Sequence, residues 1–279
     1  MLGVAAGLAT IHFLLPVSLQ NALAFDHSQF NVYSLWTAAF VHADNLHLVT
    51  NLGGFVVAMT VLWLLYDHLD QQATLRRSLA IFVVVFPIPI SLFSYYVYQF
   101  HYNATEAVTR GFSGVVASLF AFLFASLIAY GWRRWRWQKA VGLGTLVLLP
   151  SMLLILETAN MLTPVVGVLG VAVIASSSYL LVPTDRVDGS LLRPWKFDGR
   201  EDEFLIVLAS ILVLVVAISS LFPIDWIGQD SVKNVFSHFA GFALGFLYGG
   251  VLWMWKDLIP EKLDGVDSKR VENLVGIKD

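Results

Sequence analysis

The stretch "SGVVASLFAFLFASLIAYG", residues 113–131, contains no charged residue. A bilayer core of about 30 Å requires about 20 apolar residues per helix, so this stretch is long enough to cross a membrane. The basic and aromatic run "WRRWRWQK", residues 132–139, follows at once. Arg and Lys beside Trp are typical of the inner membrane interface, so the two stretches together predict a transmembrane helix that ends on the inner side.

Similar apolar stretches recur along the chain. Of its 279 residues, 57% are hydrophobic and 13% are charged, against about 45–50% and about 25% in soluble domains. We therefore predict an all-α, polytopic transmembrane bundle. It has about eight spans, near residues 1–20, 47–66, 78–100, 113–131, 141–158, 164–182, 204–222 and 236–256.

The positive charges predict the orientation. With the amino terminus inside, 15 Lys and Arg residues fall on the inner side and two, Arg110 and Lys233, fall outside. By the positive-inside rule both termini are expected in the cytoplasm. The apolar start of the chain has no preceding Lys or Arg, so we interpret it as a first span rather than a cleaved signal peptide.

Three polar segments interrupt or follow the spans. We expect one transmembrane domain over residues 1–259, with an interfacial outer segment near 21–46 and a cytoplasmic loop near 183–203. Residues 260–279 are expected to form a cytoplasmic tail. The net charge of −3 argues against nucleic acid as a partner, and the absence of cysteine excludes disulfides and thiolate chemistry.

Polar residues at membrane depth indicate a functional site, because burying them unpaired is costly. His47 and Asn51 are spaced to lie on one face of the second span, Ser113 begins the fourth, and His238 begins the eighth. In the predicted orientation all of them fall in the outer third of the bilayer. Three separate parts of the chain therefore converge on one layer.

This set of residue types suits acyl transfer. A serine hydroxyl is a weak nucleophile that needs a base, and histidine can take its proton and return it to a leaving amine. We expect Ser113 as the nucleophile and His238 as the base. His47, Asn51 and the free N–H groups at the start of the fourth span are expected to donate to the oxyanion.

Two pairs of glycines have a mechanical role in this interpretation. Gly111 and Gly114 leave space around the serine, and Gly241 and Gly245 have the spacing that allows two membrane helices to pack closely. The facing surface on the fourth span is expected to consist of small residues, namely Gly114, Ala117, Ser118 and Ala121.

These segments resemble the rhomboid intramembrane serine proteases. The resemblance covers "LWTAAFVHADNLHLVTN" (35–51), "GFSG" (111–114) and "SHFAGFALG" (237–245), in the order found in that family. It implies a six-helix core, a Ser–His dyad with no cofactor, and cleavage of transmembrane proteins near the outer face of the membrane. It also implies a supporting role for His42, which matches the family's first histidine.

The sequence departs from the family pattern in places. Three predicted spans separate the serine and histidine helices where the family has one, so two helices are additional, and Ala117 stands where a tyrosine often supports the histidine. The alternatives are a non-proteolytic rhomboid-like binding or quality-control factor, a transporter and a zinc site, although no H-E-x-x-H motif is present. The expected location is a prokaryotic plasma membrane.

Overall fold

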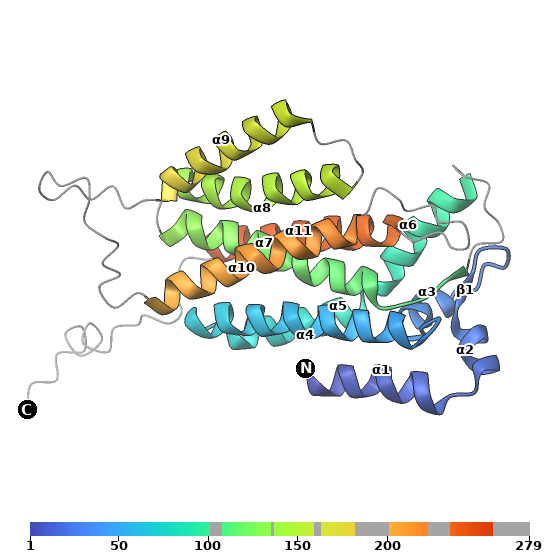
Figure 1. The fold of residues 1–279 in the computed structure, drawn as a ribbon. Coiled ribbons are helices and arrows are strands. Elements are labelled where there is room, and N and C mark those ends of the chain that lie inside the picture. Colours follow the sequence, from blue (N-terminus) through green and yellow to red (C-terminus); the bar gives the residue numbers. More distant parts are fainter. Residues whose placement is uncertain (101–107, 135–136, 159–162, 182–200, 223–234, 259–279) are drawn as a thin grey trace, which may run out of the picture.

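The structure is a computed structural model that describes residues 1–100, 108–134, 137–158, 163–181, 201–222 and 235–258 (Figure 1). The elements of these ranges are almost all helices. In chain order they are α1 (Leu2–Leu14), α2 (Val17–Leu23), β1 (Phe25–Asp26), α3 (Ser34–Thr37), η1 (Ala38–Phe40), α4 (Asn45–His68), α5 (Gln72–Val84), α6 (Pro87–Phe100), β2 (Val108–Thr109), α7 (Ser113–Arg134), α8 (Trp137–Thr158), α9 (Pro164–Leu181), α10 (Glu201–Leu221) and α11 (Val235–Leu258).

Five helices of the described ranges are long and apolar enough to cross a membrane: α4, α7, α8, α10 and α11. The pair α5 and α6 makes a sixth candidate if it forms one span, although the two helices are bent by 41°. The chain is therefore a multi-pass, all-α membrane protein. Each of the eight predicted positions contains a helix, but α1 has only 13 residues, fewer than a span requires.

Helix α7 lies at the centre of the bundle. Of its most apolar window 89% is buried, against 28% for α8, α10 and α11. Helices α4, α8, α10 and α11 all pack against it. Every face of α7 therefore meets another helix. This explains why the stretch is apolar on every side and contains many small residues.

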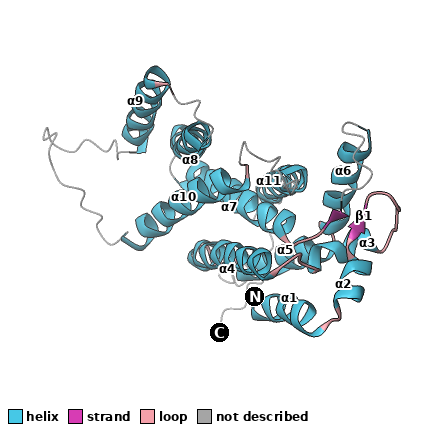
Figure 2. Ribbon diagram, turned by 45° about the vertical axis from the view of Figure 1, so that its right-hand side comes forward, coloured by secondary structure: helices cyan, strands magenta, loops and turns pink. Residues whose placement is uncertain are grey.

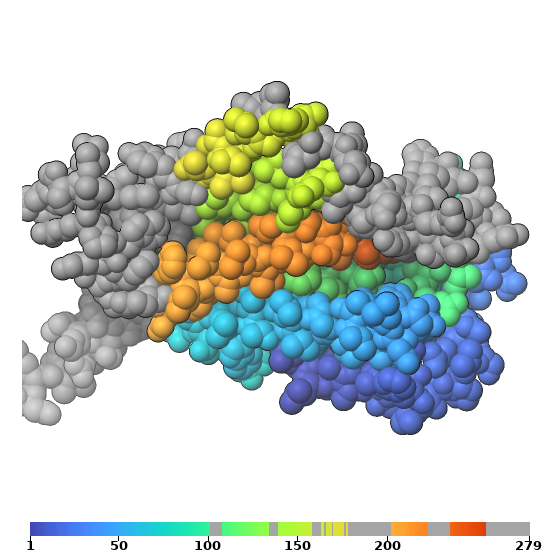
Figure 3. Space-filling model, viewed as in Figure 1, coloured from blue at the N-terminus to red at the C-terminus, as the bar shows by residue number. Residues whose placement is uncertain are grey.

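The helices that follow α7 divide into two groups. Helices α8 and α9 pack on each other at one side of the bundle, as Figure 2 shows at its upper left. Helix α10 crosses the face between α8 and α4, and in Figure 3 it is the orange rod between the yellow-green and blue surfaces. Within the described chain, α9 thus packs mainly on α8, whereas α8 and α10 both pack on α7 and on each other.

The outer segment 21–46 combines a short strand with helical turns. Strand β1 pairs antiparallel with β2, which directly precedes the start of α7. Within this segment, Phe25 and Leu35 are buried, while Phe30 and Tyr33 are exposed. The segment therefore has one side packed on the bundle and another that leaves aromatic rings uncovered.

Side-chain hydrogen bonds connect the helices away from the start of α7. Tyr66 of α4 bonds to Ser126 of α7 at 3.0 Å, and Tyr130 donates to Glu203 of α10 at 2.6 Å. Glu203 belongs to the predicted loop 183–203, so the prediction was wrong for the last three residues of that loop, which form the first turn of α10. The remainder of the loop and the tail 260–279 lie outside the described residues.

Candidate active site

The loop before α7 is shaped by Gly111. This residue has a φ of 115°, in the left-handed region that favours glycine, and its N–H donates to Ala38 O at 2.9 Å. A Cβ at this position would lie 2.5 Å from two atoms of the His47 ring and 3.3 Å from Asn51 Nδ2. Both side chains therefore lie directly against the loop that leads into Ser113.

The start of α4 fixes those two side chains. Asp44 caps the helix and accepts a hydrogen bond from His47 N at 2.8 Å. One turn later, Asn51 is only 5% exposed, and its Nδ2 atom makes no hydrogen bond within the described structure. A buried amide donor without an acceptor costs about 1–3 kcal/mol, so the structure maintains an unsatisfied donor beside Gly111.

Ser113 is the first residue of α7. Its side chain is half-buried, and the N–H groups of the first helical turn have no acceptors within the helix. The helix dipole adds partial positive charge at the same point. Negative charge that develops beside Ser113 is therefore favoured by the backbone as well as by Asn51.

His238 lies in the first turn of α11 and is held by α10. Its Nδ1 atom is 2.8 Å from Leu221 O, the last carbonyl of α10. Because a carbonyl can only accept, Nδ1 must carry the hydrogen, which leaves Nε2 as an acceptor. Ala117 offers no ring to support this histidine, and the Leu221 carbonyl orients it instead.

Helices α7 and α11 touch backbone to backbone. A Cβ on Gly241 would overlap Gly114 O, and a Cβ on Gly245 would overlap Ser118 O. A Cβ on Gly114 would also lie 3.2 Å from Ser237 O. The predicted small-residue contact is confirmed for these glycines, and it brings the residues beside Ser113 against those beside His238.

The side chains of Ser113 and His238 are not hydrogen-bonded to each other in this structure. Among the described residues, no hydrogen bond joins Ser113 to His238, and the one ring bond of His238 goes to Leu221. Catalytic hydrogen bonds are often long in unliganded enzymes and shorten in the substrate complex. No helix separates the two residues, since their own helices are in direct contact.

His42 supports the loop from the other side. Its Nε2 atom accepts from Phe112 N at 3.4 Å, and its ring lies 5.2 Å from that of His47. Burial is the main cause that lowers the pKa of His42 to about 3, and the neighbouring His47 and His12 act in the same direction. A neutral ring is the form that can accept the Phe112 N–H.

Sequence reasoning assigned no role to His12. In the structure its ring lies 6.3 Å from that of His42, and its Nε2 atom is 2.9 Å from Asn45 Oδ1 at the start of α4. Within the described ranges no three potential ligands are arranged to hold a metal ion. Only the polarity of a lone histidine inside an apolar helix could have indicated this contact.

Of the three helices between α7 and α11, α10 packs against α4, α7 and α8, while α8 packs against α7 and α9. Compared with known proteins, the chain matches no family model, and neither curated proteins nor solved structures give a match.

Proposed function

We propose that the chain is a rhomboid-like intramembrane serine endopeptidase. One observation carries this proposal: an unsatisfied amide donor, Asn51 Nδ2, lies against the loop that begins the serine helix, while that helix touches the histidine helix at Gly114 and Gly241. A structural role alone gives no reason to keep a buried donor unpaired at this place.

The proposed reaction gives each of these groups a defined role. Ser113 Oγ attacks the carbonyl carbon of the scissile bond, and His238 Nε2 accepts the hydroxyl proton. The carbonyl oxygen becomes an oxyanion that accepts hydrogen bonds from Asn51, His47 and the N–H groups at the start of α7. The proton then passes to the leaving amine, and water hydrolyses the acyl-enzyme by the same steps.

The proposed substrates are transmembrane proteins that are cut near the outer face of the membrane. The distribution of Lys and Arg supports a plasma membrane orientation with both termini in the cytoplasm and the site opening to the outside. Water must reach the acyl-enzyme, and a site at the outer ends of α4, α7 and α11 satisfies this need.

The test is labelling of the purified protein with a fluorophosphonate probe, which reacts with activated serines. We expect labelling of the wild type and none of Ser113→Ala or His238→Ala. Ser118→Ala is the matched control, because Ser118 is a buried serine of the same helix whose hydroxyl donates to Val115 O. It should label like the wild type.

Two other outcomes would change the assignment. Equal labelling of the wild type and Ser113→Ala would contradict the role of Ser113. If no form is labelled and none cleaves a single-span substrate in vesicles, the chain is the non-proteolytic binding factor rather than the protease.

A further inference from the structure

The break between α5 and α6 leaves a backbone carbonyl without its helical donor. In a continuous helix Val84 O would accept from Ile88 N, but Ile88 N lies 3.4 Å from Val85 O instead. A carbonyl within a membrane span needs a donor from the protein, because lipid offers none. The indole of Trp36 supplies it, since its Nε1 atom donates to Val84 O at 3.0 Å. A residue of the outer segment therefore satisfies the break.

The ring of Trp36 also begins a series of aromatic contacts that leads to the candidate active site. The centroid of its ring lies 4.5 Å from that of Phe40, and the Phe40 ring lies 5.9 Å from that of Phe112. Both distances lie within the range in which aromatic pairs attract each other. Phe112 is fully buried and directly precedes Ser113. The break in α5–α6 is thus connected through three rings to the neighbour of the proposed nucleophile.

The same segment, residues 36–42, holds the backbone of the GFSG loop. Ala38 O accepts from Gly111 N at 2.9 Å, and His42 Nε2 accepts from Phe112 N at 3.4 Å. These two peptide groups lead directly into the first turn of α7, whose free N–H groups are the proposed oxyanion donors. A displacement of residues 36–42 would therefore displace the loop and change the direction of those donors.

Two adjacent side chains hold the start of this segment, and they lead to different places. Thr37 Oγ1 donates to Leu23 O at 2.8 Å, at the end of α2. Trp36 donates to the break between α5 and α6. Of the side-chain hydrogen bonds that residues 34–40 make within the described structure, the one from Trp36 reaches a candidate transmembrane span. Thr37 therefore offers a matched comparison for Trp36.

An ordinary interfacial role explains only part of this arrangement. Trp36 is 38% exposed, and tryptophan is common at the level of the lipid headgroups. A residue with that role alone needs an amphipathic ring and no particular partner. The bond from Trp36 to a carbonyl 48 residues away in the sequence, at a break in a helix, is a directional contact that this role does not require.

We propose that Trp36 is a positioning residue for the GFSG loop. Its bond to Val84 O fixes residues 36–42 to the break between α5 and α6, and these residues in turn hold the loop 111–113. The inference rests on the proposed function, because the loop that Trp36 positions carries the proposed nucleophile. Its geometric part concerns the loop itself and is measurable without any cleavage.

The first test replaces Trp36 in the full chain with β-(3-benzothienyl)alanine, a ring of the same shape in which sulfur stands in place of the N–H group. We expect kcat for a single-span substrate in vesicles to fall about ten-fold, because the reacting groups are misplaced. KM should stay within about two-fold, since Trp36 is not proposed to touch the substrate. A fluorinated tryptophan, inserted by the same method, keeps the N–H group and should behave like the wild type.

Thr37→Val is the matched control for the segment. It removes the bond to Leu23 O and leaves the Trp36 bond in place, so kcat should stay within about two-fold of the wild type. A loss of kcat in Thr37→Val as large as in the benzothienyl form would overturn the proposal, because any loosening of the outer segment would then have the same effect.

The second test is amide hydrogen exchange in nanodiscs, which needs no activity. In the benzothienyl form the exchange of Gly111 and Phe112 should rise about ten-fold, while that of α11 stays unchanged. Unchanged exchange at these two amides, or an equal rise throughout α7 and α11, would overturn the positioning role. A rise confined to the loop in a chain that cleaves no substrate would support the positioning role and count against the proposed function instead.

Discussion

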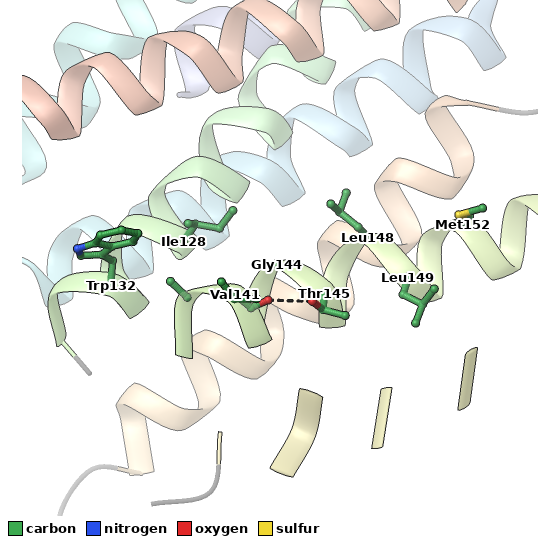
Figure 4. A pocket seen from close by; sticks show the side chains of 9 residues that line it. Ile128, Trp132, Val141, Gly144, Thr145, Leu148, Leu149 and Met152 are labelled. Carbon is green, nitrogen blue, oxygen red and sulfur yellow. Dashed lines mark hydrogen bonds between the residues drawn. The ribbon is translucent and has the colours of Figure 1, made fainter. Parts of the chain in front are cut away.

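Helix α7 meets α11 on one side and α8 on another, and the two contacts are built in opposite ways. Against α11, glycines bring backbone onto backbone, so that a single added Cβ would overlap a carbonyl oxygen at Gly241 or Gly245. Against α8, a Cβ on Gly144 would meet Ile128 Cδ1 at an ordinary 3.7 Å, and a cavity of about 450 Å³ remains beside it (Figure 4).

The difference shows what each contact is for. A dyad needs two side chains from different helices held at about hydrogen-bond distance, and that demands a closed contact with no freedom to slide. A contact that only joins an additional pair of helices to the bundle has no such demand. Glycine occurs in both contacts. Gly241 permits the close approach of α11 to α7, and Gly144 leaves space between α8 and α7.

The largest effect is expected at the active-site end of the closed contact. Asn51→Ala removes the proposed oxyanion donor and should lower kcat by about 10²–10³, the usual loss for one such group. Cleavage of a single-span substrate in vesicles measures it. Thr50→Val is the control, because the Thr50 hydroxyl bonds only to carbonyls of its own helix and its side chain is exposed. An unchanged kcat in Asn51→Ala would refute the oxyanion role.

The second largest effect is expected in the closed contact itself, that is, the backbone contact between α7 and α11. Gly241→Ala places a methyl group against the Gly114 carbonyl, which cannot turn aside as a side chain can, and should cost about 1–3 kcal/mol or more of stability. Fluorescence-detected thermal unfolding in detergent measures the loss, and probe labelling of Ser113 should fall with it. A variant as stable and as reactive as the wild type would mean that the helices are not in contact here.

A smaller effect should follow from the pH dependence of His42. Its pKa is about 3 in the folded protein against 6.5 for an exposed histidine, so the unfolded chain binds the proton more readily. The stability that His42 contributes is thus complete above about pH 6.5 and is lost progressively as the pH falls toward 3. His42→Gln should flatten the decline in melting temperature between about pH 7 and pH 5.

A second buried histidine, His27, provides a comparison for the pH test. His27 has a pKa lowered to about 4, chiefly by burial, so His27→Gln should flatten the same decline in part. Unlike His42, His27 bonds to Thr109 rather than to the backbone of the GFSG loop. A decline in melting temperature between about pH 7 and pH 5 that is as steep in His42→Gln as in the wild type would contradict a lowered pKa of His42 in the folded protein.

The smallest effect is expected at the open contact. Gly144→Ala adds a methyl group at an ordinary 3.7 Å from Ile128 and removes a glycine from a helix, so stability should rise by up to about 1 kcal/mol. A glycine-to-alanine change is therefore expected to raise the stability on α8 and to lower it on α11. Destabilisation by Gly144→Ala of the size expected for Gly241→Ala would show that the two contacts do not differ.

The sequence predicted the closed contact well, because its signal is local and periodic. The spacing of Gly241 and Gly245 matched Gly114 and Ser118 in the structure. The number of spans was harder to predict, since the third span is interrupted at Val85 and Phe86, before Pro87 and Pro89. Those prolines were the available signal for the bend.

Other features of the site leave no trace in the residue types. The group that orients His238 is the carbonyl of Leu221, and every residue carries a carbonyl. The glycine at position 111 permits a left-handed φ, but the Ala38 carbonyl that accepts its N–H lies far away in sequence and is not specified by any residue type. Such contacts arise from how helices are stacked, which a pattern within one helix does not specify.

The central claim is that Ser113 and His238 lie side by side at the mouth of the closed contact, and cysteine cross-linking tests it most directly. The chain has no native cysteine, so Ser113→Cys/His238→Cys carries only the two thiols of interest. A short bifunctional thiol reagent should join them in membranes, and should fail in the control Ser113→Cys/Met152→Cys, whose second thiol lies on α8. Failure of the first pair, or equal cross-linking of both, would contradict the account.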